Sequence, residues 1–254
     1  MINYNNHNIT EMHYNGHKIK YAYGCDGSLV FGESPSPFIG GKAKIIDNSG
    51  NTYVIECNSS TTLVSQEEHM ATGGINNSAY TEVWIGDCVT TLGDQLFQVI
   101  NVNHNVGASS ITLSNNVTTI GNNVFEGTQI TSIILPSGVT SIGIGVFKDC
   151  RNLQSIDIPT GITEIPISAF EDCTSLSSVT LHSGITSIGQ SAFLNCTGLQ
   201  SATVLSPTPP TLGTNAFSFT DGGMATYPIY VPDVEAYKAA PVWEDYGNRL
   251  FQIQ

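Results

Sequence analysis

The stretch SGVTSIG at residues 137–143 recurs almost unchanged as SGITSIG at 183–189, and TGITEIP lies between them at 160–166. Two further variants, NNVTTIG at 115–121 and DCVTTLG at 87–93, precede them. A phenylalanine follows each copy, and a sixth closes the series, with steps of 28, 22, 23, 23 and 24 residues: Phe97, Phe125, Phe147, Phe170, Phe193 and Phe217. Two independent markers with one period indicate a structural unit that is stacked, not a site used once.

Each unit has the pattern of two extended pieces and a turn. In LQSIDIP at 153–159, Ile156 and Ile158 alternate with polar residues, which is the period of a strand with one buried face. The proline that ends this stretch cannot donate a ladder hydrogen bond, so the strand stops there. GITEI at 161–165 starts a second extended piece on the far side of the coil, and 169–173 has the spacing of a short helical turn.

A period of 20–29 residues is typical of leucine-rich repeats. One copy cannot bury its apolar face alone, whereas stacked copies share a continuous core. The sequence therefore predicts a β-rich α/β solenoid, a right-handed leucine-rich-repeat coil. We expect a small β-hairpin region at 1–37, a second hairpin and N-terminal cap at 38–78, about six repeats at 79–227, and a strand-helix C-terminal cap at 228–254.

The pattern LxxIxIPxxVTxIGxxAFxxC, over about residues 79–217, resembles the BspA-like leucine-rich-repeat proteins of bacteria. The stretch PIYVPDVEAYKAAPVWEDYGNRL at 228–250 resembles the terminal segment of that family. ECNSSTTL at 56–63 resembles a leader found in prophage-associated members. The resemblance implies a non-enzymatic protein whose usual assignment is surface binding or adhesion.

The negative net charge of the chain limits the classes of partner that it can bind. The formal net charge is −13, and residues 1–50 contain four Lys and four acids, so the whole excess lies in 51–254. An acidic surface repels phosphate, which makes nucleic acid and anionic membrane poor partners. No run approaches the roughly 20 apolar residues that membrane insertion needs. The start, MINYNNHNIT, has neither the basic nor the apolar region of a signal peptide, so the sequence leaves the localisation undecided between a cell surface and a phage particle.

Two functions fit these features. The first is a non-catalytic binding or adhesion module that contacts a protein or glycan ligand through its strand face. The alternative is a structural or host-recognition component of a phage or prophage particle. Tail genes beside this gene would favour the alternative, whereas an intact leader upstream of Met1 would favour the first function.

No catalytic, metal or cofactor motif is present in the sequence. The six His form no HExxH, and no P-loop, GxSxG or Rossmann fingerprint occurs. Cys150, Cys173 and Cys196 are each 23 residues apart and occupy one repeat position. A metal or disulfide ladder is one interpretation, but without a CxxC pair we favour three reduced, buried, metal-free thiols. We predict that the protein is not an enzyme and binds no cofactor.

The outward strand positions supply the candidate binding residues. Most are Ser or Thr, but Trp84, Ile134 and Asp157 break this small polar series. An exposed Trp is a common binding anchor. Alternatively, the longer first repeat folds its extra residues, 98–107, over Trp84 and buries it.

Two sets of positions test the backbone of the repeat. The residue before the central Val or Ile of each phrase is Gly or Asn in four copies, which predicts positive φ at these positions: Asn116, Gly138, Gly161 and Gly184. The residue that closes the phrase is Gly121, Gly143, Pro166 or Gly189 in the same copies. Because proline holds φ near −65°, the closing glycines are not there for positive φ, and we expect close packing instead.

Both ends of the solenoid need caps. Asn15-Gly16 and the stretch 43–57 predict two N-terminal hairpins. Asp233 is placed to N-cap a helix over 234–240, which Pro241 ends. We expect four apolar residues to cover the last repeat: Trp243, Tyr246, Leu250 and Phe251.

Overall fold

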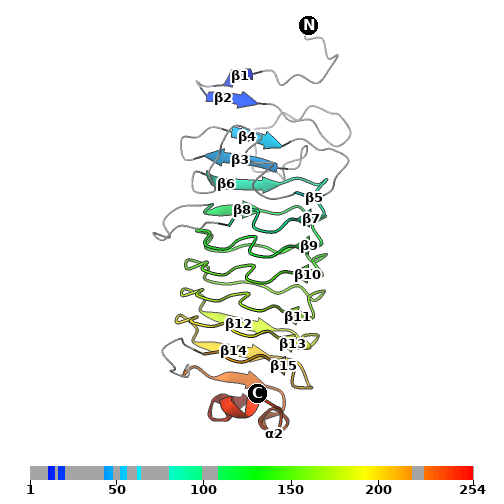
Figure 1. The fold of residues 1–254 in the computed structure, drawn as a ribbon, viewed down its shortest axis with the longest axis vertical. Helices are drawn as coiled ribbons and strands as arrows, with labels where there is room; N and C mark the ends of the chain where they lie inside the picture. Colours follow the sequence, from blue (N-terminus) through cyan, green and yellow to red (C-terminus); the bar gives the residue numbers. More distant parts are fainter. Residues whose placement is uncertain are drawn as a thin grey trace.

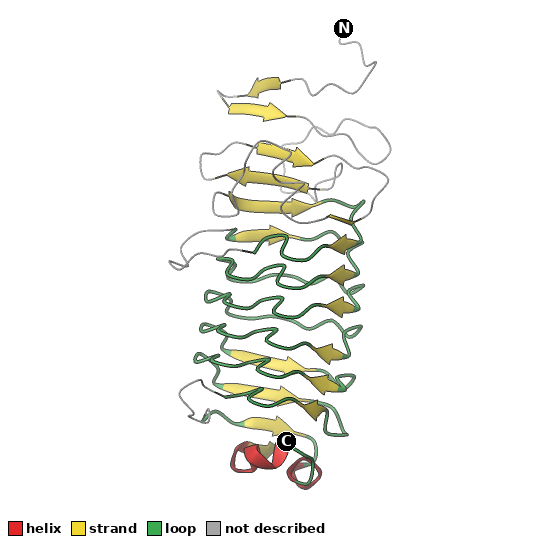
Figure 2. Ribbon diagram, viewed as in Figure 1, coloured by secondary structure: helices red, strands yellow, loops and turns green. Residues whose placement is uncertain are grey.

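The computed structural model describes residues 11–14, 17–20, 43–47, 52–55, 62–63, 80–98, 108–218 and 226–253. Within these residues the chain forms a tall stack of solenoid turns, one for each repeat, which we call courses. Their strands lie in two columns (Figures 1 and 2). The long-strand face consists of β6 (Tyr80–Ile85), β8 (Ser110–Thr112), β12 (Ser178–Leu181), β14 (Ser201–Val204), β16 (Ile229–Val231) and β17 (Leu250–Gln252). The short-strand face consists of β5 (Thr62–Leu63), β7 (Thr91–Leu92), β9 (Thr119–Ile120), β10 (Ser141–Ile142), β11 (Glu164–Ile165), β13 (Ser187–Ile188) and β15 (Thr211–Leu212).

The strands of neighbouring courses pair in parallel, and the paired residues lie one repeat apart in the sequence. Ser178 of β12 pairs with Ser201 of β14, one 23-residue step later. Thr91 of β7 pairs with Thr119 of β9, across the 28-residue first step. The predicted β-rich leucine-rich-repeat solenoid is therefore confirmed. The expected helical turn is a tight turn instead, since Cys173 N–H donates to the Phe170 carbonyl at 3.2 Å without continuing into a helix.

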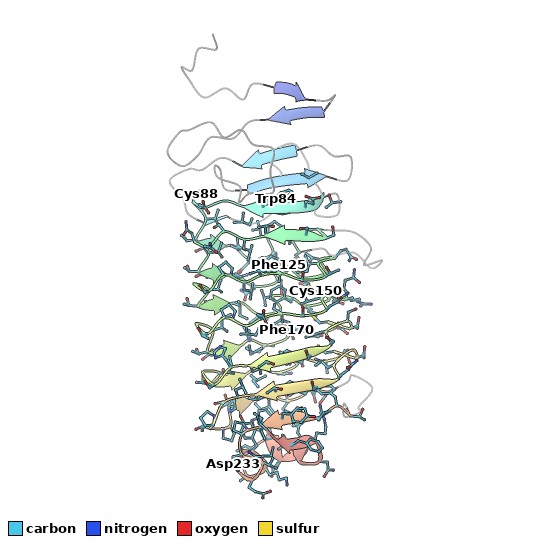
Figure 3. The ribbon with its side chains drawn as sticks, turned by 180° about the vertical axis from the view of Figure 1, so that it is seen from behind. Trp84, Cys88, Phe125, Cys150, Phe170 and Asp233 are labelled. Atoms are coloured by element: carbon cyan, nitrogen blue, oxygen red, sulfur yellow. The ribbon has the colours of Figure 1, made fainter. Side chains whose placement is uncertain are left out.

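The core is a column of phenylalanines. All six are fully buried, and neighbouring ring centroids lie 5.9, 5.0, 5.4, 5.1 and 5.1 Å apart along the column. This spacing follows the strand spacing of about 4.8 Å, because each course contributes one ring. The predicted column of Phe147, Phe170 and Phe193 is confirmed, and it extends from Phe97 to Phe217; Figure 3 labels two of its members.

The prediction of positive φ at the turn glycines was wrong. Neither Asn116 nor Gly138, Gly161 or Gly184 has positive φ. These residues lie in four-residue turns; for example, Val139 N–H donates to the carbonyl of Pro136 at 3.0 Å. A type I turn has this hydrogen bond and needs no left-handed residue.

Positive φ occurs instead two residues before all six core phenylalanines, and two residues after the four for which that position is described. Two residues before the ring it is found at Gln95, Asn123, Gly145, Ser168, Ser191 and Asn215. Two residues after the ring it is found at Gly127, Asp149, Asp172 and Asn195. The chain reverses direction around the ring, and small polar residues that tolerate the left-handed region fill most of these positions.

The closing glycines are packed closely, as predicted. A Cβ at Gly143 would lie 2.4 Å from the carbonyl carbon of Gly121 in the preceding course. A Cβ at Gly189 would lie 2.5 Å from the backbone nitrogen of Ile167. Any larger side chain at these positions must push two courses apart.

The N-terminal strands extend the long-strand face. β1 (Glu11–Tyr14) and β2 (His17–Lys20) form an antiparallel pair, and β3 (Ala43–Asp47) and β4 (Thr52–Ile55) form another. The strands of both predicted hairpins are thus confirmed, whereas their turns lie outside the described residues. β3 also pairs with β6, which gives a six-stranded sheet in the order β1-β2-β4-β3-β6-β8.

The C-terminal cap covers the last course. Asp233 caps α2 (Val234–Lys238) by accepting from the backbone N–H groups of Glu235 and Ala236, as predicted. The helix stops two residues short of the predicted end at Ala240. Trp243 and Tyr246, in the 3-10 helix η1 (Trp243–Arg249), and Leu250 are buried.

Phe251 does not cover the last repeat, so that prediction was wrong. Its side chain is 49% exposed and lies beside Tyr230, with ring centroids 6.1 Å apart. The reason is strand alternation, since Leu250 of β17 points inward and its neighbour must point outward. Among the described residues no helix has the length and apolar character needed to cross a membrane.

Candidate functional site

Two of the three candidate residues lie exposed on the long-strand face. Ile134 is 86% exposed, the highest value among the large apolar side chains of the described residues. Asp157, one 23-residue step later, is also exposed. No strand pairing joins β8 to β12 within the described part of the chain, so both residues lie in extended segments between the paired regions of this face.

Trp84 lies apart from this pair. It is half-buried in β6, where it pairs with Lys44 of β3 on one side and Thr112 of β8 on the other. Of the residues expected to fold over it, 98–107, only Gln98 lies within the described part of the chain. The structure therefore places Ile134 and Asp157 in adjacent courses, whereas Trp84 lies on the same face in an earlier course.

The repeat cysteines form a buried structural column. Cys150, Cys173 and Cys196 are free and fully buried, which confirms this part of the prediction. Their thiols donate to the carbonyls of Phe125, Phe147 and Phe170 at 3.0, 3.1 and 3.0 Å. Burial raises the pKa of Cys150 to about 12 and raises the pKa of each of the other two as well. Protonated thiols are poor nucleophiles and poor metal ligands, because the thiolate is the reactive form.

The short-strand face has an interruption at Pro166. In three other courses the closing glycine donates its N–H to a carbonyl of the preceding course, at 2.8 Å for Gly121, 2.7 Å for Gly189 and 2.8 Å for Gly213. Gly143 makes no such bond among the described residues, although β10 still pairs with β9. Pro166 has no N–H and cannot donate to the carbonyl of Ile142. The ladder loses one hydrogen bond here because of this single residue.

A second ladder hydrogen bond is missing three residues earlier. The N–H groups of Thr118, Thr140 and Thr186 donate to threonine carbonyls of the preceding course at 2.8, 2.9 and 2.8 Å. The equivalent N–H of Thr163 has no acceptor among the described residues. Accordingly β10 pairs with β9 and β11 pairs with β13, but β10 and β11 do not pair.

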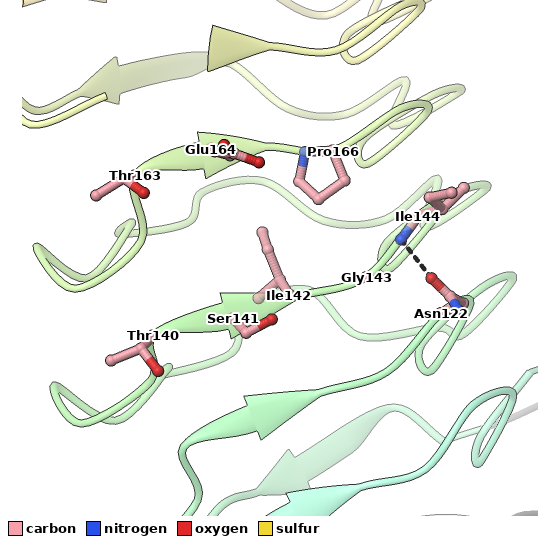
Figure 4. Close-up of a pocket in the computed structure, with 9 residues that line it drawn as sticks. All are labelled: Asn122, Thr140, Ser141, Ile142, Gly143, Ile144, Thr163, Glu164 and Pro166. Atoms are coloured by element: carbon pink, nitrogen blue, oxygen red, sulfur yellow. Dashed lines mark hydrogen bonds between the residues drawn. The ribbon is translucent and has the colours of Figure 1, made fainter. Parts of the chain in front are cut away.

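The interruption opens a groove between β10 and β11, which we call the Pro166 groove (Figure 4). Its volume is ≈ 430 Å³. Its polar lining consists of Asn122, Thr140, Ser141, Thr163 and Glu164, and its apolar lining consists of Ile142, Ile144 and Pro166. The proline ring occupies a position where neighbouring courses leave no room for a Cβ, which explains why the courses separate here.

The hydroxyl groups of the Pro166 groove are not used within the solenoid. Elsewhere the hydroxyls of Thr118, Thr186 and Thr211 donate to carbonyls of the preceding course at 3.2, 3.1 and 3.4 Å. Among the described residues, Thr140 and Thr163 make no equivalent hydrogen bond. Two hydroxyls, the N–H of Thr163 and the carbonyls of Thr140 and Ile142 thus lie around the groove without these structural partners.

One wall of the groove is rigidly held. The side-chain oxygen of Asn122 accepts from the N–H of Ile144 at 2.8 Å, and its amide nitrogen donates to Asp94 at 3.1 Å. Asn122 therefore fixes the backbone at Ile144, whose side chain stays 50% exposed.

The sequence contains one signal for this groove. Pro166 is the exception in the series of closing glycines, and the amino-acid sequence alone shows that exception. Thr140, Thr163 and Glu164 carry no signal of their own, since Thr and acidic residues are common on the whole surface. Among the described residues, no group of three or more His, Cys, Asp or Glu is placed to hold a metal ion.

The repeats match the model of the BspA type leucine rich repeat region in 6 copies over residues 90–222, which is more than half of the chain. The chain belongs to this family. No curated protein matches the chain.

Three bacterial proteins are among the solved structures that are similar to the chain. A leucine-rich repeat protein from Eubacterium ventriosum has 20% identity and a TM-score of 0.48, and the match covers 73% of this chain and 51% of that one. The pneumococcal vaccine antigen PcpA has 14% identity and a TM-score of 0.45, over 87% and 64% of the two chains. A leucine rich cell surface protein from Faecalibacterium prausnitzii has 15% identity and a TM-score of 0.29, over 98% and 95%. The chain thus spans about half to two thirds of the first two proteins.

Proposed function

We propose that this chain is a non-catalytic binding module that attaches to a protein or glycan ligand on another cell through its long-strand face. The observation that carries the proposal is the exposure of Ile134, at 86%, in the middle of a face of small polar residues. An isolated apolar side chain of this size loses contact with water when a partner covers it. Extended faces of solenoids commonly serve as binding surfaces.

The chemistry of the described residues supports binding over catalysis. The buried thiols are protonated and engaged in hydrogen bonds, so they are not nucleophiles. Asp157, beside Ile134 in the next course, adds one carboxylate that selects for a donor or a cation on the partner. The excess of negative charge favours a neutral or basic partner surface.

The test is a binding assay with the full chain on arrays of cell-surface proteins and glycans. We expect Ile134→Ser to weaken binding by about tenfold or more, as truncation of a central anchor does. Asp157→Asn should weaken it less and make it less dependent on salt. Thr180→Ser is the matched control, because it changes the same outward column without removing its hydroxyl.

Three outcomes would contradict the proposal. Binding that neither Ile134→Ser nor Asp157→Asn alters would move the site away from the long-strand face. A chain that binds nothing on either array would remove the binding function. Chemical change of a bound ligand would show that the module is catalytic.

A further inference from the structure

We propose that the Pro166 groove is a second binding site, a subsite for one neutral pyranose unit of a glycan. The groove lies on the short-strand face, between β10 and β11, and shares no residue with the proposed contact at Ile134 and Asp157. It deepens the proposed function, on which it rests, by naming a ligand class and a separate place for it. Its volume of ≈ 430 Å³ is within the range of small-ligand sites, roughly 300–1,000 Å³.

The hydrogen-bonding groups of the groove suit vicinal hydroxyls. A sugar hydroxyl both donates and accepts, so one such group can accept from the N–H of Thr163 while it donates to the carbonyl of Ile142. Both of these backbone groups lack their ladder partners, as does the carbonyl of Thr140. The exposed carboxylate of Glu164 adds two acceptor oxygens, which can receive two neighbouring hydroxyls of one ring. The free hydroxyls of Thr140 and Thr163 complete a lining that matches a polyol.

The apolar lining suits the C–H face of the same ring. Ile144 is 50% exposed, and Pro166 presents a rigid ring at the edge of the groove. Packing of sugar C–H groups against such carbons removes apolar surface from water on both sides. A polar wall facing an apolar wall is the arrangement that an amphipathic ring requires.

The charge of the groove decides which sugars enter. Glu164 is its one ionisable lining residue, and neither Lys nor Arg lines it. A uronic or sialic acid would bring a carboxylate close to Glu164 without a cation to compensate for it. The groove therefore selects neutral pyranosides and rejects acidic ones. A single unit should bind weakly, and a surface glycan gains strength when several chains or sites engage it together.

The experiment measures binding of methyl glucoside, methyl galactoside, methyl mannoside and N-acetylglucosamine to the full chain by saturation-transfer NMR, with glucuronate as the acidic comparison. Glu164→Gln removes the charged acceptor and should weaken binding about tenfold. Ser141→Ala should also weaken it, whereas Ser187→Ala, at the equivalent position of β13, should not. Pro166→Gly restores the missing N–H, removes the ring and should abolish binding; thermal unfolding checks that each variant stays folded.

The possible outcomes distinguish a failure of the Pro166 groove as a sugar site from a failure of the proposed binding function. Loss of pyranoside binding in Glu164→Gln and Pro166→Gly, with Ser187→Ala unchanged, supports the proposal. Pyranoside binding that all variants retain, or glucuronate binding as tight as that of neutral sugars, overturns it. Attachment to a surface protein that is lost in Pro166→Gly, without any sugar binding, overturns the ligand class and leaves the binding function standing. A chain that binds neither sugars nor surface ligands overturns both.

Discussion

At residue 166 a proline lies where neighbouring courses have glycine. Proline differs from glycine in its missing N–H and in its ring, and both differences weaken the contact between β10 and β11. The missing N–H removes a ladder hydrogen bond of the kind that Gly189 makes at 2.7 Å. The ring takes space that a Cβ at Gly143 or Gly189 does not have. One side chain thus separates β10 from β11. Among the described strands of the short-strand face, these two alone follow each other in sequence and do not pair.

Phe170 provides the most direct test of the core. Its ring lies between those of Phe147 and Phe193, at centroid distances of 5.4 and 5.1 Å, and is fully buried. Phe170→Ala leaves a cavity inside a stack that cannot collapse, so we expect a loss of about 3–5 kcal/mol in the free energy of unfolding. Chemical denaturation of both proteins measures it. A loss below about 1 kcal/mol, small against core truncations in general, would show that the ring is not in the core.

The repeat cysteines should resist modification in the folded protein. Because burial raises the pKa of Cys150 to about 12, its thiolate is scarce at neutral pH, and the same cause acts on Cys173 and Cys196. We expect thiol reagents to label these three residues only after denaturant is added. Mass spectrometry of the labelled peptides locates each modification. Rapid labelling of all three in the native state, or stoichiometric zinc in the purified protein, would contradict the buried column.

At the level of strands and turns, alternation of apolar residues located the strands well, but glycine did not locate the left-handed residues. Glycine permits positive φ without requiring it, and the turn at Gly138 uses a conformation open to other residues. Asn123 and Asn195, which do have positive φ, belong to a residue type enriched in that region. The amino-acid sequence indicates the place of the groove, because Pro166 is the exception among the closing glycines. It does not predict that the Thr163 N–H lacks an acceptor, because that depends on the spacing between two courses.

The connection between the N-terminal strands and the repeats should contain a disulfide. Cys88 is disulfide-bonded and the three repeat cysteines are free, which leaves Cys25 and Cys57 as partners. β4 and β6 run in the same direction, since both are antiparallel to β3, and they lead to the adjacent strands β5 and β7. Cys57 and Cys88 follow β4 and β6 by two and three residues, so we predict the pair Cys57–Cys88.

Peptide mapping without reductant tests this pairing, after free thiols have been alkylated at low pH. The expected product is a linked peptide that contains Cys57 and Cys88 and separates on reduction. A peptide that links Cys88 to Cys25, or an alkylated Cys88, would contradict the predicted pair.

Across the molecule, the described repeats share one core but not one uninterrupted ladder. Both faces lose pairing in the middle of the stack, between β8 and β12 on the long-strand face and between β10 and β11 on the short-strand face. The continuous phenylalanine column holds these courses together across the interruption. Exposed Ile134 and the Pro166 groove both lie in this central region, where β10 and β11 do not pair and no strand pairing joins β8 to β12.

The N-terminal hairpin should be dispensable for the fold of the repeats. β2 pairs with β4 through one residue pair, Ile19 with Thr52, whereas β3 pairs with β6 through five. Removing residues 1–37 therefore leaves the larger contact intact, and we expect the truncated chain to keep its circular dichroism spectrum and a cooperative thermal transition. Aggregation or a lost transition would instead make this segment an essential cap.

Native-state hydrogen exchange of the Thr163 amide tests the interrupted ladder most directly. The amides of Thr118, Thr140 and Thr186 donate across courses and should exchange slowly, whereas that of Thr163 has no acceptor among the described residues and should exchange fast. Their equivalent positions in the repeat make these threonines internal controls for one another. Fast exchange at Thr163 alone is the result that the structure predicts. Protection of Thr163 equal to that of Thr140 and Thr186 would show an unbroken ladder and would remove the Pro166 groove.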